Sequence, residues 1–386
     1  MDNAATTKMH PDVVSAMLPY MTEYFGNPSS VHDFSRAPKK AIEHAREQVA
    51  HVIGCKPEEV YFTAGGSESN NWAIKGVAFA NQKKGRHIIT SSIEHHAVIH
   101  PCEWLVSQGF EVTVLAVDDY GIVSPESVAA AIRDDTILVS IMFANNEIGT
   151  IEPIAEIGAI CKMRGVYFHT DAVQAVGHVP INVDAMNIDL LSLSAHKFHG
   201  PKGVGCLYIR KKVKIDGLIH GGGQERKRRA GTENVSGIVG LGAAIERAAT
   251  VMPESSKHIQ KLRERLIEGI LTIPHSRLNG HPVHRLSNNV NVIFEFIEGE
   301  SILLLLNQSG VAASTGSACT SASLEPSHVL MACGIPHEHV HGSLRLTLGE
   351  ETTEDDVSYV IEILPGIVQR LRDISPLTPD ELRSKK

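Results

Sequence analysis

Two charged side chains directly follow apolar runs that are typical of buried strands. Asp171 ends the run 166–170, where a buried carboxylate needs a partner. It can form a structural cap or ion pair, or it can keep a pyridine nitrogen protonated, which makes the ring an electron sink. Lys197 follows the run 190–194 and precedes a turn with Gly and Pro. It is either a surface lysine or a Schiff-base lysine, whose ammonium loses its proton more easily when desolvated.

A pair of glycines, Gly65 and Gly66, lies where a third strand-like run changes to a helical pattern. Glycines let the backbone approach a ligand, and the free amides of a new helix favour a phosphate. Ser67 can add its hydroxyl, or it can be an ordinary helix cap. No Gly-Lys-Ser/Thr follows, which excludes a P-loop, and the glycines at 221–223 lack the Rossmann spacing. A phosphate cradle, a ring-nitrogen carboxylate and a Schiff-base lysine are together the three anchors of pyridoxal phosphate, here Ser67, Asp171 and Lys197.

The elements that must position these residues alternate between strand-like and helical patterns from about residue 34 to 210. Strands are expected at 59–63, 87–91, 111–117, 137–142, 166–170, 190–193 and 205–209. This alternation predicts an α/β domain with a central, mostly parallel sheet and helices on both faces, and ligands bind beyond the carboxyl ends of such strands. A helix over 257–272 and isolated strands such as 289–296 then predict a smaller α+β domain. We expect a large domain over residues 10–255 and a small one formed by 1–9 and 256–386.

The length and the charge of the chain exclude several classes of protein. A chain of 386 residues suits two domains of ordinary size. The net charge of −8 argues against direct nucleic-acid binding, and the basic run 226–229 is either a solvated turn or a phosphate or partner contact. No stretch approaches the ~18–20 apolar residues of a membrane span, and the first residues lack the regions of a signal peptide. We therefore expect a soluble, cytoplasmic protein without membrane association.

The cysteines and histidines give no pattern of a resident metal site. None of the six cysteines forms a C-x-x-C pair, which argues against structural zinc and against a redox dithiol. His96 and His100 are one helical turn apart, and histidines alternate at 337, 339 and 341, but no Cys or acidic cluster accompanies either set. We expect no intrinsic metal ion.

The most specific pattern is a series of motifs that extends over nearly the whole chain. In chain order these are DNAATT at 2–7, FGNPSS at 25–30, ANNEIG at 144–149, HTDAVQ at 169–174, SAHK at 194–197 and STGSACTS at 314–321. With them the chain resembles the NifS/IscS-type cysteine desulfurases, in the aminotransferase class V group of pyridoxal-phosphate enzymes. The resemblance implies the fold type I of such transferases. It also implies removal of sulfur from L-cysteine to give L-alanine and a persulfide on Cys319.

The resemblance further implies a role for each matching residue. The residues implied to hold the cofactor are Gly66, Ser67, His95, Asn146, Asp171, Gln174, Ser194, His196 and Lys197, with Thr232 reaching the phosphate of the neighbouring subunit in a homodimer. Lys197 forms the Schiff base and later moves a proton, Asp171 pairs with the pyridine nitrogen, and Gln174 bonds the ring oxygen. His95 stacks on the ring and assists proton transfer. Asn146 and Arg345 hold the substrate carboxylate, and Cys319 is the nucleophile.

Cys319 lies in a segment, residues 312–323, that is nearly all Ala, Ser, Thr and Gly. Such a segment has little to bury, so we expect a mobile loop, which suits a sulfur carrier that must reach both substrate and acceptor. The other cysteines are expected to be buried and inert. The resemblance implies an iron–sulfur cluster scaffold as a sulfur acceptor, with which Cys319 can be a transient ligand of a [2Fe–2S] cluster. A tRNA-thiolation relay and cofactor synthesis stay open as other destinations.

The chain departs from the family's pattern at three points. Ser67 stands where a threonine is usual, the short strand that usually precedes DNAATT is missing, and the chain stops soon after Pro376, where relatives often carry a longer tail. Two other functions stay open. One is a selenocysteine lyase or another class V enzyme, although the Cys319 segment argues against an aminotransferase. The other is a non-catalytic sulfur or iron–sulfur carrier, which would leave Lys197, Asp171 and Ser67 unexplained.

Overall fold

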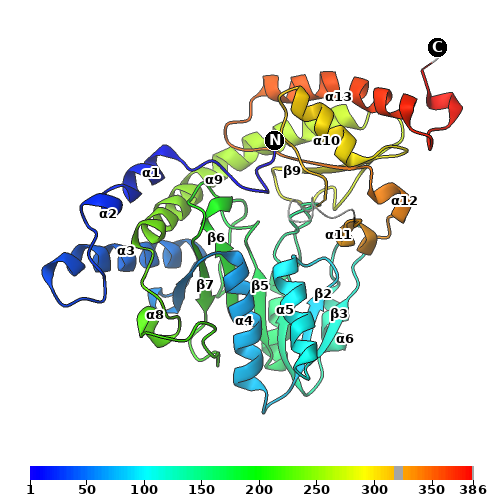
Figure 1. Ribbon diagram of the computed structural model, residues 1–386. Helices are drawn as coiled ribbons and strands as arrows, with labels where there is room; N and C mark the ends of the chain where they lie inside the picture. The colour runs from blue at the N-terminus through cyan, green and yellow to red at the C-terminus, as the bar shows by residue number, and fades with distance from the viewer. Residues whose placement is uncertain (317–324, 385–386) are drawn as a thin grey trace.

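A mixed sheet of seven strands forms the centre of the larger part of the molecule (Figure 1). The computed structural model describes residues 1–316 and 325–384. The strands are β1 (Val60–Thr63), β2 (His87–Ser91), β3 (Glu111–Leu115), β4 (Thr136–Ser140), β5 (Tyr167–Asp171), β6 (Leu190–Ser194) and β7 (Gly205–Ile209), in the spatial order β1-β7-β6-β5-β4-β2-β3. Each overlaps the strand expected there, which confirms the α/β class.

Strand direction brings most of the carboxyl ends to one edge of this sheet. From β3 through β2, β4 and β5 to β6, neighbouring strands are parallel. β7 is antiparallel both to β6 and to β1, so β1 points in the same direction as β6. The mostly parallel sheet is therefore confirmed, and the loops after β1, β2, β4, β5 and β6 open on the edge where ligands bind in such folds.

Successive side chains of the central strands enter different hydrophobic clusters, because strand side chains alternate between the two faces. The helices beside the sheet include α3 (Arg36–Ile53), α4 (Gly66–Asn81), α5 (His96–Ser107), α7 (Ile154–Arg164) and α9 (Val235–Ile270). Ile88 and Leu190 join the cluster that contains α4 and α5, whereas Ile89 and Leu191 join the cluster that contains α3, α7 and the first half of α9. Both faces are covered, as the sequence predicts.

The smaller core surrounds a three-stranded antiparallel sheet in the order β10-β9-β8. Its strands are β8 (Ser276–Leu278), β9 (Asn289–Phe294) and β10 (Ser343–Thr347), and they pack with α10 (Gly299–Gln308), α13 (Glu354–Ile374) and the end of α9. The remaining α-helices of the described residues are α1 (Pro11–Met17), α2 (Pro19–Thr22), α6 (Pro125–Ala131), α8 (Gln224–Lys227), α11 (His328–Ala332) and α12 (His337–Val340). The expected smaller α+β part is present.

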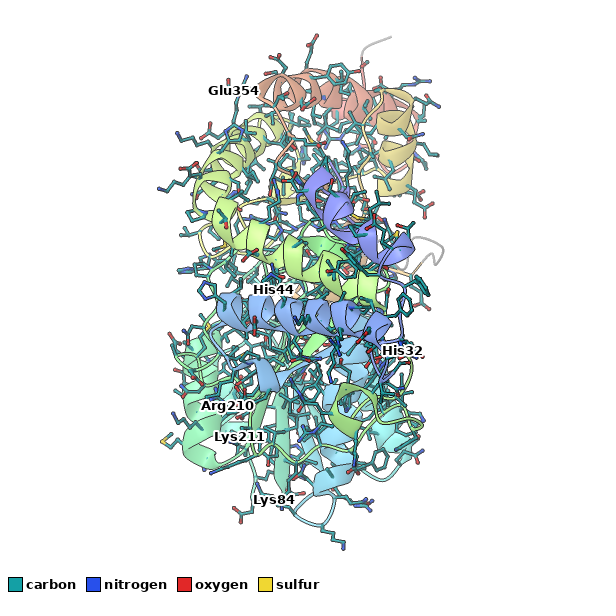
Figure 2. All side chains as sticks on the ribbon, turned by 90° about the vertical axis from the view of Figure 1, so that its left-hand side faces the viewer. His32, His44, Lys84, Arg210, Lys211 and Glu354 are labelled. Carbon is teal, nitrogen blue, oxygen red and sulfur yellow. The ribbon has the colours of Figure 1, made fainter. Side chains whose placement is uncertain are left out.

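The 36-residue helix α9 extends through both parts of the molecule. Its first half crosses beside α3 (Figure 2), and a Cβ on Gly242 would lie only 2.8 Å from Cα of Ala45. Its second half supplies Ile259, Leu262 and Leu266 to the smaller core. The helix predicted from the sequence began at residue 257, which was wrong, since α9 begins at Val235. The small residues that allow the close approach to α3 weaken the apolar pattern in the first half of α9, so the pattern did not indicate a helix there. The domain boundary at 255 falls within the helix and stays a prediction.

Within the described residues, α9 is also long and apolar enough, by length and composition, to cross a membrane. This corrects the expectation that no stretch approaches that length. The qualifying window has a mean hydropathy of 1.3, and 44% of it is buried inside the molecule. A core helix of a soluble protein meets the same test, and α9 supplies buried residues to both cores.

Candidate active site

A pocket of about 200 Å³ lies at the sheet edge where the predicted strand ends meet. The predicted residues that line it are Gly66, Ser67, His95, Asn146, Asp171, Gln174, Ser194, His196, Lys197 and Arg345. Most of them follow β1, β2, β4, β5 and β6, whereas Arg345 comes from β10 in the smaller core. Ala4 and Ala5 of the N-terminal segment also line it. The pocket is therefore built by both parts of the molecule.

The turn between β1 and α4 can hold an anion. Gly65 has φ +153°, a conformation that other residues rarely adopt, and a Cβ on Gly66 would lie 2.7 Å from Cγ2 of Val173. Both positions therefore need glycine. Within the described residues, α4 begins without a capping side chain, so Ser67 is not the ordinary cap that the sequence left open. The first amides of α4 lie at the pocket wall, where a phosphate is favoured.

Asp171 is held at the pocket by neutral donors. It is only 5% exposed, and its carboxylate accepts hydrogen bonds from the Val173 amide at 3.0 Å and from Nδ2 of Asn70 at 2.6 Å. Oδ1 of Asn70 is buried and has no hydrogen-bond partner in the part of the chain that the structure describes. A buried carboxylate held in this way favours a cationic partner such as a protonated pyridine nitrogen. The residues present therefore fit pyridoxal phosphate.

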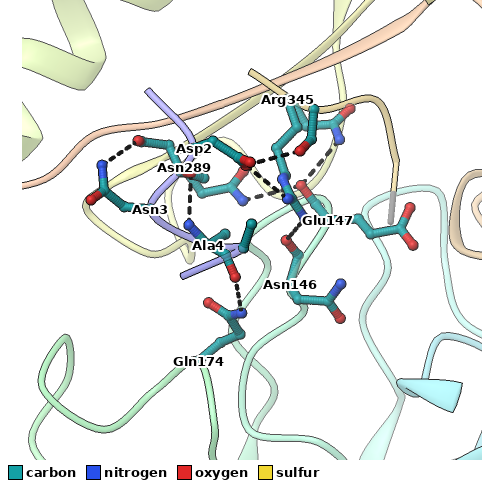
Figure 3. A network of polar contacts seen from close by, with 12 residues as sticks. Asp2, Asn3, Ala4, Asn146, Glu147, Gln174, Asn289 and Arg345 are labelled. Carbon is teal, nitrogen blue, oxygen red and sulfur yellow. Dashed lines mark hydrogen bonds and ion pairs between the residues drawn. The ribbon is translucent and has the colours of Figure 1, made fainter. Parts of the chain in front are cut away.

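The N-terminal segment forms the wall beside Lys197. Nζ of Lys197 donates to the carbonyl oxygens of Ala4 and Ala5, the latter at 2.9 Å. Nε2 of Gln174 donates to the same Ala4 carbonyl at 3.0 Å (Figure 3). The Ala4 amide in turn donates to Oγ1 of Thr347 on β10 at 2.9 Å. This segment connects the lysine to the smaller core.

Burial keeps several titratable groups around the pocket neutral. Burial, followed by the charge of Lys197, lowers the pKa of His196 to about 4. Burial lowers the pKa of His169, which lies two residues before Asp171 on β5, to about 3. Burial raises the pKa of Glu94 to about 8. His95 follows Glu94 and caps α5, with its Nδ1 accepting from the Ala97 amide at 3.0 Å. The acidic and basic side chains with predicted roles that line the same pocket are Asp171, Lys197 and Arg345.

Arg345 is 1% exposed and is anchored at two nitrogens (Figure 3). Nη1 donates to the carbonyl oxygen of Asn146 at 2.9 Å, and Nη2 pairs with Oδ1 of Asp2 at 3.1 Å. Nε is buried and finds no hydrogen-bond acceptor among the described residues. The structure thus places Asn146 and Arg345 together and leaves guanidinium donors for a carboxylate ligand, whose binding by these two residues stays a prediction.

Thr232 and Cys319 do not belong to this described pocket. Thr232 lines a second pocket of about 180 Å³, together with Thr63 and Glu225, so its role toward a neighbouring subunit stays a prediction. Cys319 lies outside the described residues. Among the described cysteines, burial raises the pKa of Cys102, Cys161, Cys206 and Cys333 to about 12 and also raises that of Cys55. Such thiols are poor nucleophiles.

Sequence reasoning gave no role to Asn70, which lines the pocket, or to Asp2, which pairs with Arg345. Asn70 lies four residues after Gly66 on α4, which places both on one face of the helix, and this spacing was a usable signal. Asp2 meets Arg345 across almost the whole length of the chain, and no local pattern predicts that contact.

The comparisons with known proteins agree with this geometry. The family Aminotransferase class-V matches residues 1–360. Cysteine desulfurase IscS of Methanosarcina thermophila is 67% identical over 384 residues, which covers 100% of this chain and 95% of that protein. A solved NifS-like protein superposes with a TM-score of 0.91 at 40% identity, over 96% of this chain and 99% of the other. A structure described as SspA in complex with cysteine gives 0.81 at 39% identity, over 91% and 99%.

Members of this family use pyridoxal phosphate, the cofactor that the pocket's residues fit. The match covers the large sheet, the smaller core and every motif on which the resemblance rested. The chain therefore belongs to the aminotransferase class-V family and, within it, to the NifS/IscS-type cysteine desulfurases.

Proposed function

We propose that this protein is a cysteine desulfurase, which removes the sulfur of L-cysteine with pyridoxal phosphate as cofactor. The products are L-alanine and a persulfide on Cys319. The observation that carries the proposal is a single pocket containing Lys197, Asp171 and Arg345. These supply an amine, a carboxylate for the ring nitrogen and a guanidinium for the substrate carboxylate. Full-length relatives named cysteine desulfurase, at 50% to 67% identity, support the same activity.

The pocket's residues bind the substrate and move its protons. When bound, the cofactor supplies an electron sink for the charge left when the substrate Cα loses its proton. Arg345 and Asn146 hold the substrate carboxylate and so fix the orientation of the amino acid. Lys197 takes the Cα proton and returns one. Asp171, which accepts a hydrogen bond from Asn70, would hold the proton on the ring nitrogen. Ser67 and the first amides of α4 would hold the phosphate.

Cys319 receives the sulfur in the proposed reaction. Its thiolate attacks the substrate sulfur, so that an S–S bond forms as the bond from Cβ to sulfur breaks. Cβ gains a proton in place of the one that the thiol lost, which balances cysteine plus thiol against alanine plus persulfide. An unperturbed thiol with a pKa of ~8.5 is only a few per cent ionised at neutral pH, so local activation of Cys319 is part of the proposal.

A product balance tests this function. The purified protein should be yellow, and borohydride reduction should fix a pyridoxyl group on Lys197, as peptide mapping would show. With L-cysteine and no reductant, we expect one alanine for each persulfide formed and no requirement for a keto acid.

Three outcomes would contradict the proposal. Alanine formation that depends on a keto acid would identify an aminotransferase. Turnover of selenocysteine but not of cysteine would identify a selenocysteine lyase. A colourless protein that carries sulfur without forming alanine would be a non-catalytic sulfur or iron–sulfur carrier.

An iron–sulfur cluster scaffold is the proposed sulfur acceptor, because the similar relatives carry the name IscS. With that partner, Cys319 can also be a transient cluster ligand. A cytoplasmic location is part of the proposal. The cysteines of the described residues are free rather than paired in disulfides, which suits a reducing compartment.

We also propose that the active unit is a homodimer. Large apolar side chains are exposed on α1, α2 and the segment that follows, a gathering that often marks a protein interface. They are Val14, Leu18, Met21, Tyr24, Phe25, Val31 and Phe34. α8, which shortly precedes Thr232, lies on the same side of the molecule (Figures 1 and 2). If a second copy binds this surface, Thr232 of one subunit can reach the cofactor phosphate of the other, as the resemblance implies.

Charges placed in this surface should separate the dimer. We expect the double variant Leu18→Asp, Phe25→Asp to sediment as a monomer and to lose cofactor and activity, because each aspartate would have to be buried without a partner. Leu304→Asp is the matched control, since Leu304 is also exposed, at 66%, but lies on α10. A fully active wild-type monomer in sedimentation would refute the dimer.

A further inference from the structure

Asp2 contacts Arg345 but does not itself line the pocket. Its Oδ1 accepts from Nη2 of Arg345 at 3.1 Å (Figure 3) and from Oγ of Ser314 at 2.9 Å. Arg345 lines the pocket, whereas Asp2 does not. We propose that Asp2 is a positioning residue, which fixes the Arg345 guanidinium for the α-carboxylate of the amino-acid substrate. The inference rests on the proposed function, in which Arg345 receives that carboxylate.

The burial of Arg345 explains why it needs an anionic partner. The Arg345 side chain is 2% exposed, and a buried cation without a partner is costly. Asp2 is its ion-pair partner in the part of the chain that the structure describes. The Asp2 side chain is itself 26% exposed, so water screens part of its charge. The pair therefore stabilises the guanidinium and still leaves it attractive to a second carboxylate.

The contacts of the guanidinium fix its plane and leave donors for a ligand. A guanidinium has five N–H donors in a rigid, planar arrangement. Asn146 engages Nη1 and Asp2 engages Nη2, on two different nitrogens of that plane. Nε, which is buried, has no acceptor among the described residues. A carboxylate in the pocket can then be bound by donors that are already oriented, at little further cost in conformational entropy.

Asp2 is itself held in place by pairing with β10. The Thr347 amide donates to the Met1 carbonyl at 2.9 Å, and the amide and side chain of Asn3 both donate to the Thr347 carbonyl, at 3.3 and 2.9 Å. Thr347 is two residues after Arg345, so both side chains leave the same face of β10. Ala4 lies two residues after Asp2 in the same N-terminal segment, and its carbonyl oxygen accepts a hydrogen bond from Nζ of Lys197. One backbone segment thus positions both the guanidinium and the amine.

The test compares a ligand that has the carboxylate with one that lacks it. The cofactor-loaded protein is titrated with L-alanine, which has no sulfur to transfer, or with ethylamine, and the visible spectrum of the bound cofactor reports binding. We expect Asp2→Leu to weaken L-alanine binding roughly tenfold, the scale of a hydrogen bond to a charged group, and to leave ethylamine binding unchanged. Asp2→Asn keeps an acceptor oxygen without the charge and should lie between wild type and Asp2→Leu. In turnover, KM for L-cysteine should rise while kcat stays nearly constant.

Asn3→Ala is the matched control, because it removes only the side-chain contact of the same segment with Thr347. The backbone contacts of Met1 and Asn3 with Thr347, which hold Asp2 in place, are kept, and Arg345 is not touched. It should leave the preference for L-alanine over ethylamine unchanged. Arg345→Ala should abolish that preference. If Arg345→Ala retains it, Arg345 does not receive the carboxylate, and that part of the proposed function is wrong. If Arg345→Ala abolishes it but Asp2→Leu and Asp2→Asn retain it, the inference about Asp2 is wrong. Should Asp2→Leu fail to show a normal melting transition, the nearly isosteric Asp2→Asn decides.

Discussion

The Cys319→Ser variant is expected to bind the cofactor and L-cysteine but to release neither alanine nor sulfide. The cofactor-binding residues of the pocket are unchanged in this variant, and so are Lys197 and Arg345, which act on the substrate. The step that is lost is the attack on the substrate sulfur, because a serine hydroxyl is a poor acceptor for sulfur. Adding L-cysteine should therefore change the visible spectrum of the variant, and the change should persist. Alanine release measures the effect directly.

Cys55→Ser is the matched control for this experiment. Cys55 is half-buried, and burial raises the pKa of its thiol, so its replacement should leave alanine release close to the wild-type rate. Isotope-labelled cysteine, given to the wild type without reductant, should leave label on Cys319 alone. If Cys319→Ser releases alanine at the wild-type rate, Cys319 is not the nucleophile, and the lyase or aminotransferase alternatives gain support.

The sheet and most of the pocket could be predicted from the sequence because both depend on local patterns. Most strands are short runs rich in apolar residues, and the alternation of strands with helices determines which ends of the strands meet. Asp171 and Lys197 directly follow such runs, so their places at the sheet edge follow once the sheet is recognised. The glycines at 65 and 66 are visible for the same reason, since they lie at a strand-to-helix turn.

The features that the sequence did not reveal depend on contacts between distant residues. The first half of α9 is rich in glycine and alanine, which favour close packing on α3 but weaken the apolar period of a helix. The N-terminal segment interacts through its backbone with Thr347 on one side and with His196 on the other, and backbone contacts leave no pattern of side chains. Asp2 and Arg345 are 343 positions apart in the sequence, so only the folded structure shows that they pair.

Asp171→Ala is expected to lower turnover at least ~100-fold while the protein stays folded. A factor of this size corresponds to about 3 kcal/mol of lost transition-state stabilisation, the scale of one preorganised electrostatic contact. The contact is strong because Asp171 is buried, where a charge acts with little screening, and because Asn70 and the Val173 amide already fix its carboxylate. Initial rates of alanine formation at saturating L-cysteine and cofactor measure the loss.

Two further variants separate the charge of Asp171 from its structural role. Asn70→Ala removes a hydrogen-bond donor to Asp171 but leaves the charge, so we expect a smaller loss of turnover than in Asp171→Ala.

Asp189→Asn is the matched control at the opposite end of the sheet. Asp189 accepts from the Phe168 amide at 3.0 Å, pairs with Arg210 at 3.4 Å and does not line the active-site pocket. Its replacement should lower the melting temperature and leave turnover nearly unchanged. A carboxylate that stabilises charge in the ring is needed for a fast reaction, so its removal must slow turnover. Near-normal turnover of Asp171→Ala with full cofactor occupancy would therefore show that Asp171 is only structural.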